Sequence, residues 1–345
     1  MTAGIDPAAV SGWLLANLEG VRAPFGFEPV PGGRSNLTYI VTDGAGRRMV
    51  LRRPPISHVL PSAHDMGREH RIISALRPTP VPVPAALGYC ADEAVNGRPF
   101  YVMDFVDGYV LRDAAQAAGV LDEPTRMVAG GDLVDVLAAL HEVDVEAVGL
   151  GDLARHDGYV ERQLRRWHGQ FRQSQQQARE AGVYRPVPLV DEVHALLAER
   201  IPAQRGTAIV HGDYRLDNTV VSADGRVRAV LDWELCTLGD ALADVGTLLA
   251  YWDPVPGAGL PRAATTLPGF PSPAEVVRRY AGRSGRDVAG IGFYVAFALW
   301  KLACIAEGVF VRHAADAMGA TGVDAMAFSS ASSDRARRAL EILRS

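Results

Sequence analysis

The sequence predicts an α+β protein with two lobes, a small lobe built on an antiparallel sheet and a larger, mainly helical lobe. From Phe27 to Val106, short apolar runs alternate with turns rich in glycine and proline, a pattern typical of strands. After Gly108, apolar residues recur at the spacing of amphipathic helices. We therefore divide the chain into residues 1–106, with a leading helix at 7–19, and residues 107–345.

A third observation is the stretch Thr207–Gly246, where polar residues follow strand-like runs inside the helical lobe. The apolar run Ala208–Val210 predicts a buried strand. Asp213 and Asn218 lie in the loop after it, and Asp232 ends the last of two further strand-like runs. Because strand ends are held rigidly, the three side chains can be aimed at one point.

The composition is that of an ordinary globular protein. The 345 residues are 48% hydrophobic and 22% charged, and a net charge of −5 gives no indication of nucleic-acid binding. Three cysteines lie far apart and form no metal-binding spacing, which indicates a reducing compartment. The first residues lack the parts of a signal peptide, and the apolar run Ile291–Leu299 is too short to cross a bilayer. We expect a cytoplasmic monomer or homodimer with no nucleic-acid or membrane partner.

Asp213, Asn218 and Asp232 together suit phosphoryl transfer. That reaction needs an oriented nucleophile and metal ions that neutralise charge. Asp213 can accept the proton of a hydroxyl group, Asn218 offers an oxygen ligand for Mg²⁺, and Asp232 can bridge the metal to phosphates. Each residue alone is better explained as a turn or cap residue, but the three together and in this order favour catalysis.

The residues His211-Gly212-Asp213…Asn218, followed by Asp232-Trp233-Glu234, resemble the aminoglycoside phosphotransferase and choline kinase superfamily, the small-molecule branch of the kinase fold. The resemblance implies a two-lobed protein-kinase-like fold that binds ATP and Mg²⁺ between its lobes. It implies Asp213 as the catalytic base, Asn218 and Asp232 as metal ligands, and Asp240 and Asp244 as carboxylates that brace the catalytic loop. Trp233-Glu234 replaces the Phe-Gly of protein kinases, so switching of this segment is not expected.

Within this interpretation the small lobe supplies the nucleotide site. A turn containing Gly33, Ser35 and Asn36 can lay backbone N–H groups over phosphates, although a plain hairpin is the alternative. Arg52 ends the next strand, where kinases place a phosphate-binding cation. Glu69 lies within the apolar stripe of the following helix, and a buried carboxylate needs a partner. We expect it to pair with Arg52; the alternative is a helix rotated so that Glu69 reaches solvent.

Three further features concern the nucleotide base and the acceptor. The strand from Pro99 to Val106 corresponds to the kinase hinge, so we expect backbone groups at Met103, Asp104 and Val106 to meet the adenine edge. Tyr251–Pro273 is a long loop that can contribute to a substrate pocket. The predicted helix from Gly158 to Arg172 carries a basic face, either solvated or a binding surface for an anionic substrate; its arginines, with one just before the helix, are Arg155, Arg162, Arg165, Arg166 and Arg172.

The same helix, together with Leu231–Glu234 and Thr237–Asp240, resembles a narrower group, the kinase-like domains that occur fused to, or encoded beside, acyl-CoA dehydrogenases. This implies a hydroxyl on an acyl chain as acceptor. The sequence thus predicts an ATP- and Mg²⁺-dependent phosphotransferase that acts on a small-molecule alcohol, such as a hydroxyacyl-CoA or hydroxy acid. The alternatives are an antibiotic phosphotransferase and a non-catalytic nucleotide-binding regulator.

Overall fold

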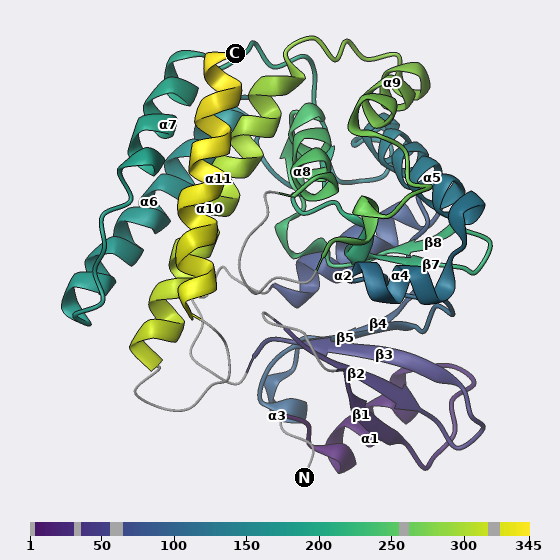
Figure 1. Ribbon diagram of the computed structural model, residues 1–345. Helices are drawn as coiled ribbons and strands as arrows, with labels where there is room; N and C mark the ends of the chain where they lie inside the picture. Colours follow the sequence, from purple (N-terminus) through teal and green to yellow (C-terminus); the bar gives the residue numbers. More distant parts are fainter. Residues whose placement is uncertain (1–3, 31–35, 56–64, 255–261, 317–324) are drawn as a thin grey trace.

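The computed structural model describes residues 4–30, 36–55, 65–254, 262–316 and 325–345. A small sheet lobe and a larger helical lobe lie one above the other in Figure 1, so the predicted α+β division is confirmed. The sheet has five antiparallel strands in the order β1-β2-β3-β5-β4. Their bounds are β1 Gly26–Pro29, β2 Leu37–Thr42, β3 Arg48–Arg53, β4 Ala86–Cys90 and β5 Phe100–Asp104.

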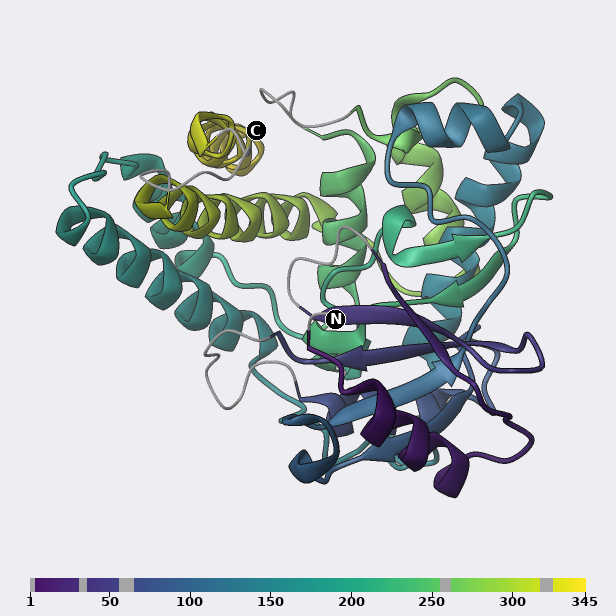
Figure 2. The ribbon, with the colours of Figure 1, turned by 90° about the horizontal axis from the view of Figure 1, so that it is seen from below.

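Two helices cover the two faces of this sheet. Helix α1 (Pro7–Asn17) is capped by Asp6 and packs on the face turned away from the large lobe, as Figures 1 and 2 show. Helix α2 (Met66–Leu76) packs on the opposite face, where its apolar stripe meets Tyr101 and Met103. Since successive residues of a strand point to opposite faces, Arg52 shares the cleft-side face with Val50, whereas Arg53 points away.

The connection between β4 and β5 differs from the expected turn at Asn96-Gly97. Residues Glu93–Asn96 form a single helical turn, α3, capped by Asp92. Gly97 ends it with φ +71°, the left-handed conformation that glycine adopts without steric cost. β5 also ends at Asp104, two residues before the predicted end at Val106.

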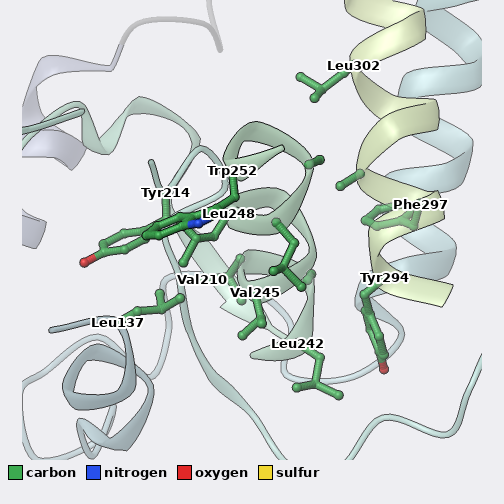
Figure 3. Close-up of a cluster of buried hydrophobic side chains, with 14 of the residues drawn as sticks. Leu137, Val210, Tyr214, Leu242, Val245, Leu248, Trp252, Tyr294, Phe297 and Leu302 are labelled. Carbon is green, nitrogen blue, oxygen red and sulfur yellow. The ribbon is translucent and has the colours of Figure 1, made fainter. Parts of the chain in front are cut away.

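The large lobe is a layered helical assembly. Its helices are α4 Ala114–Val120, α5 Glu123–Glu142, α6 Tyr159–Glu180, α7 Pro188–Glu199, α8 Leu242–Trp252, α9 Pro273–Ser284, α10 Ile291–Asp316 and α11 Ala325–Arg344. Helix α8 lies at the centre, where Leu248 and Trp252 point toward Tyr214 while Phe297 and Leu302 approach from α10 (Figure 3).

Helix α10 is longer than the apolar run Ile291–Leu299 suggested. Residues Ile291–Ala314 are long and apolar enough to cross a bilayer by length and composition alone, whereas the run Ile291–Leu299 by itself is not. However, 78% of the most apolar part of this helix is buried inside the protein, between α6, α8 and α11. It is therefore the core helix of the large lobe.

Two short antiparallel strand pairs carry the loop that follows Ala208–Val210. That strand, β6, pairs with β9 (Thr237–Gly239), and β7 (Thr219–Val221) pairs with β8 (Val227–Val230). The strand that was predicted to end on Asp232 therefore ends at Val230, and Asp232 lies in the loop beyond it, with φ +65°. Asp232 is the one non-glycine residue with positive φ in the described ranges, and such strain persists where the surroundings over-determine the backbone.

Candidate active site

A cleft of about 1090 Å³ lies between the lobes and contains the predicted catalytic residues. Asp213, Asn218 and Asp232 line its floor, and Arg52 and Asn36 reach it from the sheet. The space is sufficient for a nucleotide together with a small acceptor. Side chains from distant parts of the chain therefore converge on one cavity, as the predicted site requires.

Asp213 is oriented by two donors. Asn218 Nδ2 donates to Asp213 Oδ2 and to the Asp213 carbonyl, both at 2.9 Å, and Arg215 Nε donates to Oδ2 at 3.2 Å. A single 3₁₀ turn, Leu216–Asn218, brings Asn218 back to the aspartate. The use of Nδ2 leaves Asn218 Oδ1 without a hydrogen-bond partner in the described part of the chain, so this oxygen is free to bind a cation.

The backbone before Asp213 is held by Asp244 of α8. Its carboxylate accepts the N–H groups of His211 and Gly212 at 2.6 and 2.8 Å. Burial raises the pKa of Asp244, but the hydrogen bond from His141, the nearby histidine charges and the backbone donors outweigh burial, and the net pKa is lowered. His141 also contacts Tyr280 Oη, at 2.7 Å, and lies outside the cleft lining. It therefore supports Asp244, which braces the loop as the sequence suggested.

The surroundings of Gly212 explain why glycine occurs at this position in the loop. Its φ is +86°, and a Cβ atom would lie 2.8 Å from the Leu235 carbonyl oxygen. Neither the backbone conformation nor the space permits a side chain here.

Sequence reasoning did not assign a site role to Lys301. Its Nζ, from α10, donates to the Gly212 carbonyl at 2.5 Å and lies 5.5 Å from the centre of a Trp167 ring. The side chain is buried, and burial lowers the pKa of the ammonium group. Lys301 is the single lysine in a sequence whose other long basic side chains are all arginines. A lone lysine inside an apolar helix was the available indication of a special role.

Asp232 connects the loop to the small lobe. Its Oδ1 accepts a hydrogen bond from Arg52 Nη2 at 2.8 Å. The preceding residue, Leu231, donates its N–H to the Asn218 carbonyl at 2.8 Å and accepts from His211 Nε2 at 2.9 Å. These bonds hold the strained backbone of Asp232 and leave Oδ2 without a partner among the described residues.

Glu69 is 1% exposed, so the alternative in which it reaches solvent is wrong. It accepts hydrogen bonds from Tyr101 Oη at 3.0 Å and Asn36 Nδ2 at 3.2 Å, and its Oε2 lies 3.5 Å from Arg52 Nη1. Burial raises the pKa of Glu69 against the opposing effect of Arg52. The pKa of Arg52 lies well above its ordinary value, because the surrounding acidic groups outweigh burial.

Two polar atoms of this cluster lack partners. Arg52 Nε and Asn36 Oδ1 are buried without a hydrogen bond in the described residues. An unpaired donor on a buried guanidinium group, facing a cleft, is what a phosphate oxygen would satisfy. Arg52 and Asn36 are therefore where the sequence placed them, while Gly33 and Ser35 lie outside the described residues.

The predicted hinge residues line the same cleft. Met103, Asp104 and Val106 all contribute to its wall. The Asp104 N–H donates to the Ala85 carbonyl at 2.9 Å, and its carboxylate accepts from Arg47 at 2.8 Å. We therefore expect backbone contacts to an adenine edge to come from the Val106 side of this segment.

The basic face of α6 is not part of the cleft. None of its arginines belongs to the lining; Arg162 instead donates to the Arg155 carbonyl, and Arg166 lies over the Trp167 ring. In the described residues, the cations that line the cleft are Arg52, Arg112, Arg215, Arg262 and Arg335. The last four were missed because they come from loops and from the C-terminal helix, with no local motif.

The donor set fits Mg²⁺ held jointly with a nucleotide. No cluster of three or more His, Cys, Asp or Glu side chains able to bind a metal occurs in the part of the chain that the structure describes. Magnesium is usually held by one or two protein oxygens, with phosphates and water completing the octahedron. The free oxygens of Asn218 and Asp232 meet that requirement.

A five-stranded lobe lies over a helical lobe. The cleft between them contains an aspartate that is oriented by two donors, and an Arg–Glu pair. This arrangement defines a phosphotransferase with a kinase-like fold. The model of the phosphotransferase enzyme family APH matches residues 26–284. The chain belongs to this family, as its resemblance in sequence suggested.

Individual proteins agree with this assignment. A solved structure from Ralstonia eutropha JMP134, provisionally assigned as an aminoglycoside phosphotransferase, is 32% identical with a TM-score of 0.82, over 99% of this chain and 98% of that one. Aminoglycoside phosphotransferase APH(4)-Ia, solved with ADP and hygromycin B, shares the fold at 16% identity and a TM-score of 0.59, over 97% and 98% of the two chains. Acyl-CoA dehydrogenase family member 10 of Mus musculus is 35% identical over 286 residues, 81% of this chain and 26% of its own length. The chain thus spans only about a quarter of that relative.

Proposed function

We propose that this protein transfers the γ-phosphoryl group of ATP to a hydroxyl group of a small molecule, in the presence of Mg²⁺. The observation that carries the proposal is the convergence of Asp213, Asn218 and Asp232 on one cleft, beneath the Arg52–Glu69 pair. The complexes of structurally similar phosphotransferases with ADP support nucleotide use.

Each residue has a role that follows from its contacts. Asp213, oriented by Asn218 and Arg215, accepts the proton of the acceptor hydroxyl. Asn218 Oδ1 and the Asp232 carboxylate would hold Mg²⁺, which neutralises charge on the transferred phosphoryl group when bound. Arg52, fixed by Glu69, binds the phosphates, and the segment at Asp104–Val106 receives the base.

The acceptor is proposed to be a hydroxy acid or a hydroxyacyl-CoA. The named relatives include acyl-CoA dehydrogenase family members, which makes a hydroxyl on an acyl chain the first class to test. An aminoglycoside is the second candidate, because hygromycin B occupies APH(4)-Ia. The described lining carries six carboxylates beside its five arginines, so charge alone favours neither class, and the acceptor screen decides between them.

A screen for ATP consumption tests the proposal. Purified protein is incubated with Mg·ATP and with hydroxy acids, hydroxyacyl-CoAs, amino alcohols and aminoglycosides, while a thermal-shift assay reports nucleotide binding. Acceptor-dependent ADP formation with a hydroxy acid or hydroxyacyl-CoA is the expected result. Nucleotide binding without turnover on any alcohol would instead favour the regulator. Growth of cells that express the protein on aminoglycosides tests the antibiotic alternative separately.

A further inference from the structure

The five arginines that line the cleft differ in how far their charges are already satisfied. Arg52 pairs with Asp232 and Glu69, and Arg215 pairs with Asp213 and Asp217. Arg262 donates to Thr266 Oγ1 at 2.7 Å and to the Thr266 carbonyl at 2.9 Å. The guanidinium groups of Arg112 and Arg335 make no hydrogen bond or ion pair in the described parts of the chain, so their charges remain available to a ligand.

Of these two, Arg335 occupies the more enclosed position. Arg112 is exposed, whereas Arg335, in the middle of α11, is partly buried against the cleft, and burial lowers the pKa of its guanidinium group. The charge of the neighbouring Asp334 partly opposes the effect of burial, but its carboxylate accepts from Arg337 at 2.6 Å and forms no ion pair with Arg335. An unpaired cation withdrawn from water costs free energy that a bound anion would recover.

Arg335 reaches the cleft from α11 of the large lobe, whereas Arg52 and Asn36 reach it from the sheet. Arg215, which donates to Asp213, lies with Cζ 4.6 Å from the centre of the Tyr251 ring. The charges of both Asp213 and Arg335 affect the pKa of the Tyr251 hydroxyl group. These neighbours therefore lead from the base Asp213 into the large lobe, away from Arg52 and the sheet, in the order Arg215, Tyr251 and Arg335.

The Tyr251 hydroxyl adds a second free donor at this end of the cleft. It makes no hydrogen bond within the described residues, and its ring is held by Arg215. Asp253 also lines this end, but its side chain is solvent-exposed and its charge is screened by water. Asp217 lines the cleft as well, but its carboxylate is paired with Arg215 at 2.8 Å. The groups that are withdrawn from water without a partner are thus a cation and a hydroxyl donor, a combination that suits the oxygens of a carboxylate or a phosphate.

We propose that Arg335, assisted by Tyr251, forms an anion subsite that binds a carboxylate or phosphate group of the acceptor while its hydroxyl lies at Asp213. This inference rests on the proposed function and narrows the acceptor to molecules that carry such a group apart from the reacting hydroxyl. Arg335 is then a specificity-determining residue, and the chemistry at Asp213 does not depend on it.

The kinetic test compares 3-hydroxybutyrate, its methyl ester and 3-hydroxybutyryl-CoA as acceptors. The two anionic acceptors carry their charges at different distances from the hydroxyl, so Arg335→Gln is expected to raise KM for one of them by about 10- to 100-fold, the loss of a hydrogen bond to a charged group. KM for ATP and turnover of the ester should not change. Arg335→Lys should recover part of the lost affinity for the anionic acceptor, because lysine retains the positive charge but lacks the planar guanidinium group. Arg338→Gln, an exposed arginine one turn along α11 that lies outside the cleft, is the control.

A binding measurement separates this inference from the proposed function. With the nucleotide site saturated by ADP, titration calorimetry measures the affinity of citrate and of inorganic phosphate for wild type, Arg335→Gln and Arg338→Gln. Weakening of either anion by tenfold or more, in Arg335→Gln alone, supports the subsite even if no acceptor is turned over. A preference for citrate or for phosphate distinguishes a carboxylate from a phosphate ligand. Equal anion binding by all three proteins, or equal use of the ester and both anionic acceptors by wild type, overturns it.

Discussion

Lys301 illustrates how a residue outside the cleft lining can hold the catalytic loop in place. Its ammonium group reaches the Gly212 carbonyl from a helix 89 positions away in sequence, directly before the proposed base. Removing the donor leaves a buried carbonyl without a partner, which costs about 1–3 kcal/mol, but it also removes a buried charge. The unpaired carbonyl lowers the stability of the protein and the loss of the buried charge raises it. In either case the catalytic loop loses the hydrogen bond that holds it.

We expect Lys301→Met to lower kcat by about 10- to 100-fold, the order expected for a small displacement of a catalytic group, with little change in KM for ATP. The measurement is steady-state kinetics on the best acceptor. Arg312→Met, an exposed cation on the same helix, is the control. An unchanged kcat in Lys301→Met would show that the loop is held without it.

The same residue predicts a pH dependence of stability. Because burial lowers its folded-state pKa below the unfolded value of about 10.4, the unfolded chain binds more protons between the two values. The unfolding free energy of wild type relative to Lys301→Met should therefore rise as pH increases through that interval. Urea unfolding at several pH values measures the difference, and lysine-selective NMR labelling yields a single side-chain signal for the pKa. A pKa at or above 10.4 would contradict the account.

At the scale of the element, the hairpin region shows what local sequence can and cannot predict. The site formed by Asp213, Asn218 and Asp232 could be predicted from their order and spacing in the sequence. This was possible because a short strand, a 3₁₀ turn and a hairpin hold the three residues within one segment. The end of β8 was misplaced by the apolar character of Leu231 and Trp233, which pack in the loop rather than the strand. The positive φ of Asp232 has no signature in residue type.

Gly212 provides a test at this scale. Gly212→Ala is expected to destabilise the protein by about 2 kcal/mol or more, because alanine is disfavoured in the left-handed region and its Cβ meets the Leu235 carbonyl. Gly282→Ala, within α9 and with open space around it, should instead stabilise by about 0.5–1 kcal/mol. Urea unfolding compares both variants with wild type. Similar values for the two would refute the steric account of Gly212.

For the whole molecule, the fold was predictable and the acceptor side of the cleft was not. Arg52 was predicted because kinases place a cation at the end of this strand, and the apolar stripe around Glu69 indicated that the two residues pair. Arg335 and Tyr251 reach the cleft only through the packing of α11 and α8 onto α10, contacts between segments distant in sequence. No local pattern indicates such contacts, so the basic face of α6 was a plausible but unrelated candidate.

The contacts of Asp232 with both lobes predict a specific effect of Mg²⁺ on the stability of the protein. Asp232 takes part in both lobes, through Arg52 and through the loop, and its free oxygen is the proposed Mg²⁺ ligand. Asp232→Ala, which leaves no ligand oxygen, should therefore abolish the Mg²⁺-dependent part of stabilisation by ATP. At 100 times Kd, ATP stabilises wild type by about 2.7 kcal/mol. Thermal unfolding with ATP, with and without Mg²⁺, measures this effect, and an unaltered Mg²⁺ dependence in the variant would exclude Asp232 as a ligand.

The most direct measurement of the central claim is the turnover number of Asp213→Ala on the best acceptor, with nucleotide affinity measured on the same protein. Asp224→Ala, which alters an exposed aspartate in the turn of the neighbouring hairpin, is the matched control. The account predicts a fall in kcat of about 10²- to 10⁴-fold for Asp213→Ala, the usual contribution of a general base, with ATP affinity and fold unchanged. Turnover equal to that of Asp224→Ala would contradict it.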